Sequence, residues 1–196
     1  MRSTVAILLN WTVAVGFIGV GTALTLADEQ AASRTLEEVV ALITKASAES
    51  RVRFARKVRP VDARPAKAGE VVVTVIKDEG KETQSKPAKA GDWVVRNRCP
   101  QTGNEEYLVG GDKFAGRYEA TGTPVAADGW REFRPVGKRL RFVVLRPADG
   151  PFSFTAPWGE AMVARPGDAI VQDPEDEKDV YRVAKASFEC TYQVTE

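Results

Sequence analysis

The sequence predicts a mainly β protein, α+β overall, in which a transmembrane or signal helix and an amphipathic helix precede two similar barrel-like β-rich units with short helices. The chain of 196 residues is 43% hydrophobic and nearly balanced in charge, with 28 basic and 27 acidic residues, as is typical of globular proteins. Segments rich in valine, isoleucine and aromatic residues alternate with glycine- and proline-containing turns. The pattern of residues 91–118 also recurs in residues 167–192.

The first predicted element is an apolar helix within residues 1–27. Residues 3–27 include no charged residue, and about 20 apolar residues suffice to cross a bilayer as a helix. The segment ends in small residues before Asp28, so it also fits a signal peptide cleaved at that point. Under both interpretations the membrane is a partner. We expect the C-terminal domain to face the periplasm from a bacterial inner membrane, or to be secreted if cleavage occurs.

Residues 28–61 are predicted to contain an amphipathic helix and a basic linker. Thr35 and Glu38 stand at the spacing of a capping box, which marks the start of the helix. The apolar residues recur at the three-and-four spacing of one helix face: Leu36, Val39, Val40 and Ile43. This face needs a partner, which could be the later domain, a second copy of the chain or a membrane surface.

The basic stretch of residues 51–67 has seven basic residues and one acid, Asp62. Such a run near a membrane can contact anionic lipid headgroups, at about 1 kcal/mol per charge. The residues expected to do so are Arg51, Arg53, Arg56, Lys57 and Arg59. A solvated linker is the alternative interpretation. Nucleic acid is not an expected partner, because the stretch has a single aromatic residue, Phe54.

The remainder of the chain is predicted to be two copies of one unit, residues 62–122 and 123–196. Laying Gly91 on Gly167 needs one two-residue gap. It aligns Asp92 with Asp168, Val95 with Val171, Tyr107 with Tyr181, Val109 with Val183, Phe114 with Phe188 and Tyr118 with Tyr192. Ordered matches with a shared spacing indicate a duplication.

Each copy is predicted to run strand, turn, strand, tight turn, hairpin and short helix. In RPGD at residues 165–168, proline suits the second position of a type II turn and glycine the third, which requires a positive φ. The hairpin that follows has a polar loop, residues 97–104 or 173–179. Phenylalanine and tyrosine four residues apart then share one side of a helical turn and close each core. Residues 71–76 and 142–145 are expected to be equivalent strands.

The repeated pattern of Gly-Asp, strand aliphatics, an aromatic residue before an aliphatic one, and then Phe and Tyr resembles small bacterial and phage domains that carry a "PGDYLV…YPV…F…TYE" sequence. The first copy has Trp93 and lacks the proline, whereas the second keeps Pro166 and has Ala169 where an aromatic residue is usual. The resemblance implies a fold only. No activity comes with it, and no catalytic residue carries over.

The residue types present argue against common catalytic sites. The chain has no histidine, which removes Ser-His and Cys-His pairs and the usual zinc spacings. We expect no catalytic residue and no cofactor. The acidic residues of the loop 173–179 could hold Ca²⁺, although a solvated charge run explains them as well, so the metal question stays open. Cys99 and Cys190 could pair in an oxidising compartment, but free thiols are the default expectation.

The sequence therefore predicts a membrane-anchored envelope protein whose duplicated β-rich module binds a protein partner or another copy of itself without catalysis. The aromatic residues expected at a partner or ligand surface are Trp93, Tyr107 and Tyr181. Two alternatives remain, a small enzyme that uses the acidic loop 173–179, with or without a metal, and a lipid-surface sensor that uses residues 51–67.

Overall fold

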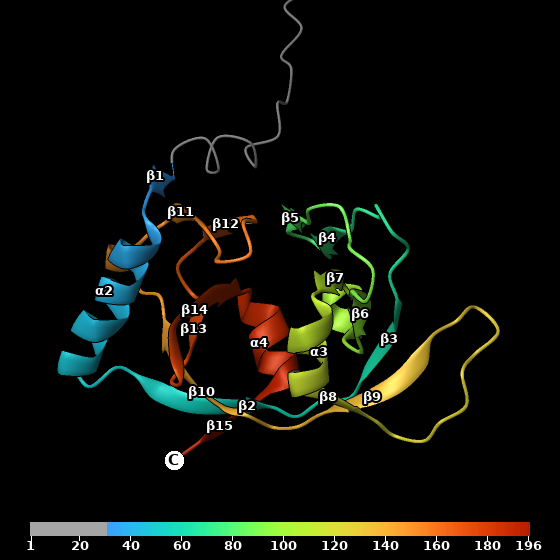
Figure 1. Cartoon of the computed structure of the whole chain (residues 1–196). Coiled ribbons are helices and arrows are strands. Elements are labelled where there is room, and N and C mark those ends of the chain that lie inside the picture. Colours follow the sequence, from blue (N-terminus) through green and yellow to red (C-terminus); the bar gives the residue numbers. More distant parts are fainter. Residues whose placement is uncertain (1–30) are drawn as a thin grey trace, which may run out of the picture.

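The computed structural model describes residues 31–196, and this part of the chain is mainly β (Figure 1). Its strands form two five-stranded sheets, a three-stranded sheet and a two-stranded hairpin. The N-terminal span that the sequence predicts, residues 1–27, lies outside the described residues. None of the helices between residues 31 and 196 combines the length and the apolar character that a membrane crossing needs.

Helix α2 (Leu36–Ala48) begins at the predicted capping box. The Glu38 N–H donates to Thr35 Oγ1 at 3.2 Å, and the Thr35 N–H donates to Glu38 Oε2 at 2.7 Å. Its buried face, which includes Val39 and Ile43, packs on residues of the later chain such as Phe152. The partner of the amphipathic helix is therefore the later domain, one of the three partners that the sequence left open.

Lobe 1 consists of one five-stranded sheet, helix α3 (Gly111–Arg117) and the hairpin of β4 (Val73–Ile76) and β5 (Gly80–Gln84). In spatial order, the sheet contains β7 (Glu106–Val109), β6 (Trp93–Asn97), β3 (Val61–Pro65), β9 (Arg131–Pro135) and β8 (Tyr118–Ala120). Helix α3 connects the two edge strands, β7 and β8. It brings Phe114 and Tyr118 into the core with their ring centroids 5.1 Å apart, as their spacing predicts.

Lobe 2 has the same plan. Its five-stranded sheet contains, in spatial order, β14 (Asp176–Val183), β13 (Ala169–Asp173), β10 (Arg139–Val144), β2 (Arg53–Lys57) and β15 (Tyr192–Thr195). Helix α4 (Lys185–Thr191) connects the edge strands β14 and β15, and places Phe188 on Tyr192. The three-stranded sheet of this lobe contains β1 (Ala32–Ser33), β11 (Phe152–Thr155) and β12 (Ala161–Ala164). Two short 3₁₀ helices complete the chain, η1 (Pro100–Thr102) and η2 (Pro147–Asp149).

The two lobes exchange strands. The described chain can be divided into two consecutive segments, β2 to β8 (residues 53–120) and β9 to β15 (residues 131–195). Strand β2 of the first segment pairs in the sheet of β10, β13, β14 and β15, and strand β9 of the second pairs in the sheet of β3, β6, β7 and β8. In Figure 1 the chain of β2 runs along the bottom of the molecule and continues into β3, which rises on the right. The lobes are therefore interlocked, and neither five-stranded sheet is complete without chain from the other segment.

The structure corrects two expectations about the strands. The basic stretch is not a linker, because its residues form β2 and β3, which are held by strand partners on both sides. Residues 71–76 and 142–145 are not equivalent, because β4 belongs to a hairpin and β10 to the middle of a sheet; the central strand of lobe 1 is β3. The sequence of β3, VDARP, has weak β propensity, so its strand character depends on pairing rather than on local preference.

The two Gly-Asp turns have the predicted geometry. Gly91 and Gly167 adopt φ values of 92° and 97°, in the region that favours glycine. In each turn the aspartate accepts a hydrogen bond from the backbone N–H three residues earlier and another from the first residue of α3 or α4. Asp92 and Asp168 therefore join each turn to the helix that follows, a structural role that accounts for both residues.

Candidate functional site

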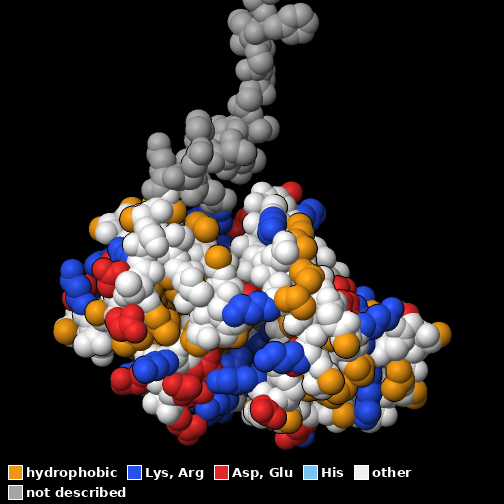
Figure 2. Space-filling view, turned by 45° about the horizontal axis from the view of Figure 1, so that its top comes forward, with side chains coloured by type: hydrophobic (Ala, Val, Ile, Leu, Met, Phe, Trp, Pro, Cys, Tyr) orange, Lys and Arg blue, Asp and Glu red, His pale blue; other side chains and the backbone are white. Residues whose placement is uncertain are grey.

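A cavity of about 620 Å³ lies between the two lobes, a size that is usual for small-molecule sites. Its walls come from the edge strands β7 and β14, from α3 and α4, and from the two hairpins. On the face drawn in Figure 2, lysine and arginine side chains line a hollow between the two bulges of the surface. All four tyrosines of the chain line the cavity: Tyr107, Tyr118, Tyr181 and Tyr192.

The tyrosines form two pairs at equivalent places in the two lobes. The hydroxyl oxygens are 3.1 Å apart in the Tyr107–Tyr118 pair and 3.3 Å apart in the Tyr181–Tyr192 pair. Burial raises the pKa of Tyr107, Tyr181 and Tyr192 above the ordinary value, and for Tyr107 the neighbouring Tyr118 adds to this effect. At neutral pH these phenols are therefore uncharged and act as hydrogen-bond donors and acceptors.

Each tyrosine pair has a cation that comes from the opposite lobe. Lys57, on β2 of lobe 2, donates from Nζ to Tyr107 OH at 2.6 Å and to Asn97 Oδ1 at 2.9 Å in lobe 1. Arg117, on α3 of lobe 1, lies 5.6 Å from the centroid of the Tyr181 ring and donates to Asp179 Oδ2 at 2.7 Å in lobe 2. Polar contacts therefore cross the cavity in both directions.

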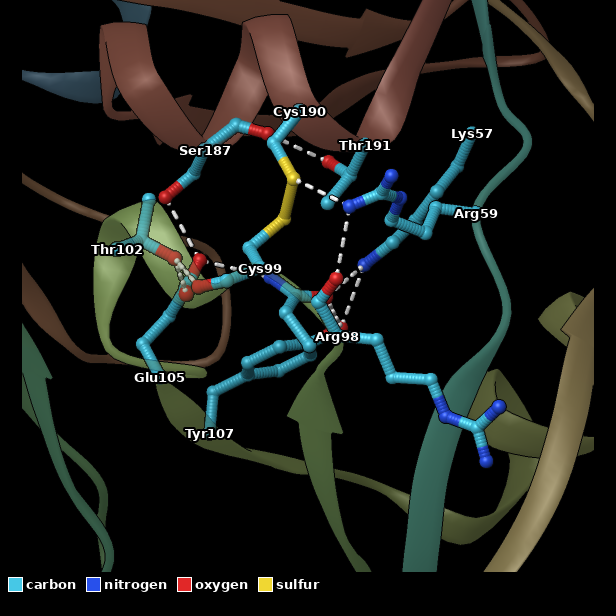
Figure 3. The surroundings of a disulfide bond; sticks show 11 residues. Lys57, Arg59, Arg98, Cys99, Thr102, Glu105, Tyr107, Ser187, Cys190 and Thr191 are labelled. Carbon is cyan, nitrogen blue, oxygen red and sulfur yellow. Dashed lines mark hydrogen bonds between the residues drawn. A yellow bond between two sulfur atoms is a disulfide. The ribbon is translucent and has the colours of Figure 1, made fainter.

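The lobes are also joined at two further places, one covalent and one ionic. The disulfide Cys99–Cys190 links the loop after β6 to α4 (Figure 3), and next to it Ser187 Oγ donates to Glu105 Oε1 at 2.6 Å. At the second place Lys113 Nζ donates to Asp179 Oδ2 at 2.6 Å. Lys113 and Ser187 stand at equivalent positions of the repeated pattern, and so do Glu105 and Asp179. The same helix-to-strand contact therefore occurs twice, once with a neutral donor and once with a charged one.

The expectation of two free thiols is wrong, because the structure pairs Cys99 with Cys190. The two cysteines are 91 positions apart and lie at non-equivalent places in the repeated pattern. They meet because α4 of lobe 2 lies against η1 and the loop after β6 of lobe 1. Sequence spacing alone carries no information about that contact.

Arg182 holds the β4–β5 hairpin of lobe 1 to strand β14 of lobe 2. Its guanidinium is 1% exposed and contacts three carboxylates, Asp168 at 2.8 Å, Glu79 at 3.2 Å, and Glu82. Three acids thus share one buried cation. Burial of the Glu82 carboxyl raises its pKa, and this effect is larger than the lowering by the charge of Arg182. The pKa of Glu82 is therefore raised from its ordinary value of 4.5 to about 7.

Trp158 marks the mouth of the cavity. It lies between β11 and β12, is 40% exposed, and its ring centroid is 6.0 Å from that of Tyr181. Met162 and Leu108 line the cavity as well and give it an apolar part. The exposed indole and the neighbouring Tyr181 ring offer an aromatic surface on which an apolar or aromatic ligand can pack.

The structure brings Tyr107 and Tyr181 into one cavity but leaves Trp93 out of it. Trp93 stacks on Phe114 at 4.3 Å between ring centroids and meets the edge of Phe133 at 5.4 Å. It is part of the core of lobe 1, because its side chain projects from β6 towards α3. Of the three aromatic residues expected at a binding surface, two therefore lie in the candidate site and one has a packing role.

The five residues expected to contact lipid do not share one surface. Arg51 pairs with Asp149 at 3.2 Å, Arg59 donates to the carbonyl of Arg98 at 2.9 Å, and Lys57 enters the cavity wall. Arg53 and Arg56 are exposed on β2. The side chains of a strand alternate between its faces, so a run of charges in the sequence is divided between them. The lipid contact stays a prediction.

The acidic segment 173–179 is mostly strand rather than loop, because only two residues separate β13 from β14. Its carboxylates are engaged by separate cations: Asp173 by Lys138 at 2.6 Å, and Asp179 by Arg117 and Lys113. Within the described part of the chain, no three acidic or cysteine side chains are grouped in a way that could hold a metal ion. A calcium or enzymatic role for this segment stays a prediction.

Sequence reasoning missed the roles of Lys57, Arg117 and Trp158 in the cavity. The only signal in the sequence was the pairing of Tyr107 with Tyr181 and of Tyr118 with Tyr192, which places all four tyrosines at repeated positions. No family model, curated protein or solved structure matches this chain. The cavity and its residues are therefore the features of the molecule that point to a function.

Proposed function

We propose that this protein is a non-catalytic binding protein of the bacterial envelope, with an N-terminal membrane anchor and a two-lobed β-rich body that binds a small ligand between its lobes. The observation that carries the proposal is the cavity of about 620 Å³, which is lined by every tyrosine of the chain and rimmed by Trp158. Of the two roles that the sequence left open, binding and assembly, the cavity favours binding.

The disulfide supports the proposed location. Stable disulfides occur mainly in oxidising compartments such as the periplasm, and Cys99 is fully buried in its pair with Cys190. Acid-quenched cells treated with a thiol-alkylating reagent test this. We expect both cysteines to be protected until a reductant is added. Alkylation without reductant in freshly quenched cells would count against export to an oxidising compartment.

The matching plans of the lobes support the proposed duplication. The two five-stranded sheets have corresponding strand orders, and Tyr118 pairs with Pro135 in β9 as Tyr192 pairs with Lys57 in β2. Two marginal units of this size would each leave a large fraction of their surface exposed, so covering each other stabilises both. A ligand site at the junction of two copies then arises from residues that both provide.

Ligand-observed NMR with a library of small fragments tests the binding function. The full chain, purified in mild detergent, is compared with Leu108→Trp, which adds bulk to the cavity wall, and with Val144→Trp, which adds the same bulk at a position that is 47% exposed. We expect fragment signals with the wild type and Val144→Trp, and loss of those signals with Leu108→Trp. Equal binding to all three proteins, or no binding to the wild type, would contradict the proposal.

A further inference from the structure

We propose that the cavity selects a small organic anion, whose single carboxylate or phosphate group is held by Lys57 and the tyrosine hydroxyls while its apolar part lies towards Met162 and Trp158. This inference rests on the proposed function, since it names the chemical class of the ligand that the cavity takes. It depends on four observations about the tyrosine end of the cavity: its charge balance, the partners of Lys57, the hydroxyl hydrogens, and the arrangement of the apolar wall.

The first observation is an excess of positive charge. The residues that line the cavity include seven lysine or arginine side chains and six acidic side chains, an excess of one basic group. Asp179 is contacted by both Lys113 and Arg117. Glu105 is held by neutral donors, Ser187 Oγ at 2.6 Å and Asn97 Nδ2 at 2.8 Å.

The excess charge is centred on Lys57. Its ammonium contacts Asn97 and Tyr107, both of which are neutral, and in residues 31–196 no carboxylate lies within ion-pair distance of it. The rings of Tyr107 and Tyr118, with centroids at 5.1 and 5.8 Å, offer only partial compensation through their π faces. A partly buried ammonium with neutral partners is a favourable place for an incoming anion, because the attraction is screened less than in bulk water.

The tyrosine hydroxyls can complete an anion site. Each hydroxyl has one hydrogen to donate, and the contact between Tyr181 and Tyr192 uses one of the two hydrogens of that pair. The other hydrogen remains for an acceptor in the cavity. Burial holds the pKa of both phenols above the ordinary value, so neither becomes a competing phenolate at neutral pH. An oxyanion accepts hydrogen bonds without offering any, which suits this set of donors.

The remainder of the wall favours an apolar or aromatic body on the same ligand. Met162 and Leu108 line the cavity, and Trp158 stands at its rim with 40% of its surface exposed. The Trp158 and Tyr181 ring centroids are 6.0 Å apart, and the two planes are tilted by 54°. A ring that enters past Trp158 can pack on this apolar wall, while an attached anionic group reaches the hydroxyls and Lys57.

Four probes test the inference by protein-observed NMR titration of the full chain in detergent. Benzoate and phenyl phosphate carry a ring and an anion of each type, benzamide is the neutral counterpart of benzoate, and inorganic phosphate is an anion without a ring. We expect benzoate or phenyl phosphate to bind at least tenfold more tightly than benzamide, and inorganic phosphate to bind more weakly than phenyl phosphate. Which of the two ring anions binds more tightly identifies the preferred head group.

Lys57→Met removes the charge and keeps a long unbranched side chain, and Lys81→Met makes the same change of net charge on the exposed strand β5. We expect the preference for benzoate over benzamide to fall to about twofold or less in Lys57→Met and to be unchanged in Lys81→Met. Retention of the preference in Lys57→Met would overturn the role of this lysine. The comparison of benzoate with benzamide in the wild type needs no variant, so a folding defect in Lys57→Met does not affect it.

The outcomes separate this inference from the proposed function. Equal binding of benzoate and benzamide to the wild type would show a cavity that takes ligands without selecting anions, so the inference would fail and the binding function would stand. The inference would also fail, and the binding function would stand, if none of the four probes bound while library fragments bound to the wild type and not to Leu108→Trp. Absence of binding by every probe and every fragment would overturn both.

Discussion

The disulfide between Cys99 and Cys190 spans 91 positions of the chain and joins the two lobes. Closing a loop of that length removes about 15 cal/mol/K of entropy from the unfolded chain, which corresponds to about 4–5 kcal/mol at 25 °C. Measured losses on removing native disulfides are about 2–5 kcal/mol. We therefore predict that Cys99→Ala combined with Cys190→Ala lowers the free energy of unfolding by about 2–5 kcal/mol. Alanine is chosen because Cys99 is fully buried, and a serine there would add an uncompensated hydroxyl.

Urea denaturation followed by circular dichroism measures this loss for the oxidised wild type, the reduced wild type and the double variant, all in the same detergent. With a urea dependence of about 2 kcal/mol/M, the midpoint should fall by about 1–2.5 M. The reduced wild type serves as the control and should agree with the double variant. A fall of less than about 0.5 M in both the reduced wild type and the double variant would refute this reasoning. It would mean that the polar contacts of Lys57, Arg117 and Arg182 hold the lobes together without the disulfide.

Three further predictions concern glycine packing, tyrosine ionisation and the shared carboxylates. Gly111→Ala places a Cβ 2.6 Å from the Gly91 carbonyl oxygen and should lower the free energy of unfolding by about 1–3 kcal/mol. Gly116→Ala in the same helix places a Cβ with nothing within 4 Å and should raise the free energy of unfolding by about 0.5–1 kcal/mol. Equal urea midpoints for the two variants would contradict this. Above pH ~10 the folded protein holds more protons than the unfolded chain, because its buried tyrosines have raised pKa values, so stability should fall by about 1.4 kcal/mol per pH unit for each of them. Phenolate absorbance that develops near pH ~10 without loss of circular dichroism would be the opposite result. Because the pKa of Glu82 is raised from 4.5 to about 7, its contribution to stability is lost as pH rises through that window, and Glu82→Gln should flatten this part of the pH profile of the urea midpoint; a parallel profile would contradict the effect.

Local features of the fold were predictable from the sequence, because each is decided by neighbouring residues. The capping box of Thr35 and Glu38 starts α2, and the turn glycines Gly91 and Gly167 have positive φ. The placement of Phe114 and Phe188 beside the tyrosines that follow them was predictable for the same reason, since residues four apart in a helical turn lie on one side.

Long-range features were not predictable, because they depend on which strands pair. Strand β3 has a polar and proline-containing sequence, and only β6 and β9 on either side of it make it a strand. The pairing of β2 with β15 places Lys57 opposite Tyr192 in the backbone register, from where its side chain reaches Tyr107 in the other lobe. The basic stretch therefore looked like a linker, although one of its lysines is a central residue of the candidate site.

The measurement that tests the binding site most directly is fluorine NMR of the full chain labelled with 3-fluorotyrosine. The chain has four tyrosines and all of them line the cavity, so every signal in the spectrum reports on it. We predict that benzoate or phenyl phosphate shifts signals of both tyrosine pairs along one saturable curve, and that Leu108→Trp abolishes these shifts. Tyrosine signals that neither these probes nor the library fragments move, in a protein that is folded by circular dichroism, would contradict a ligand site between the lobes.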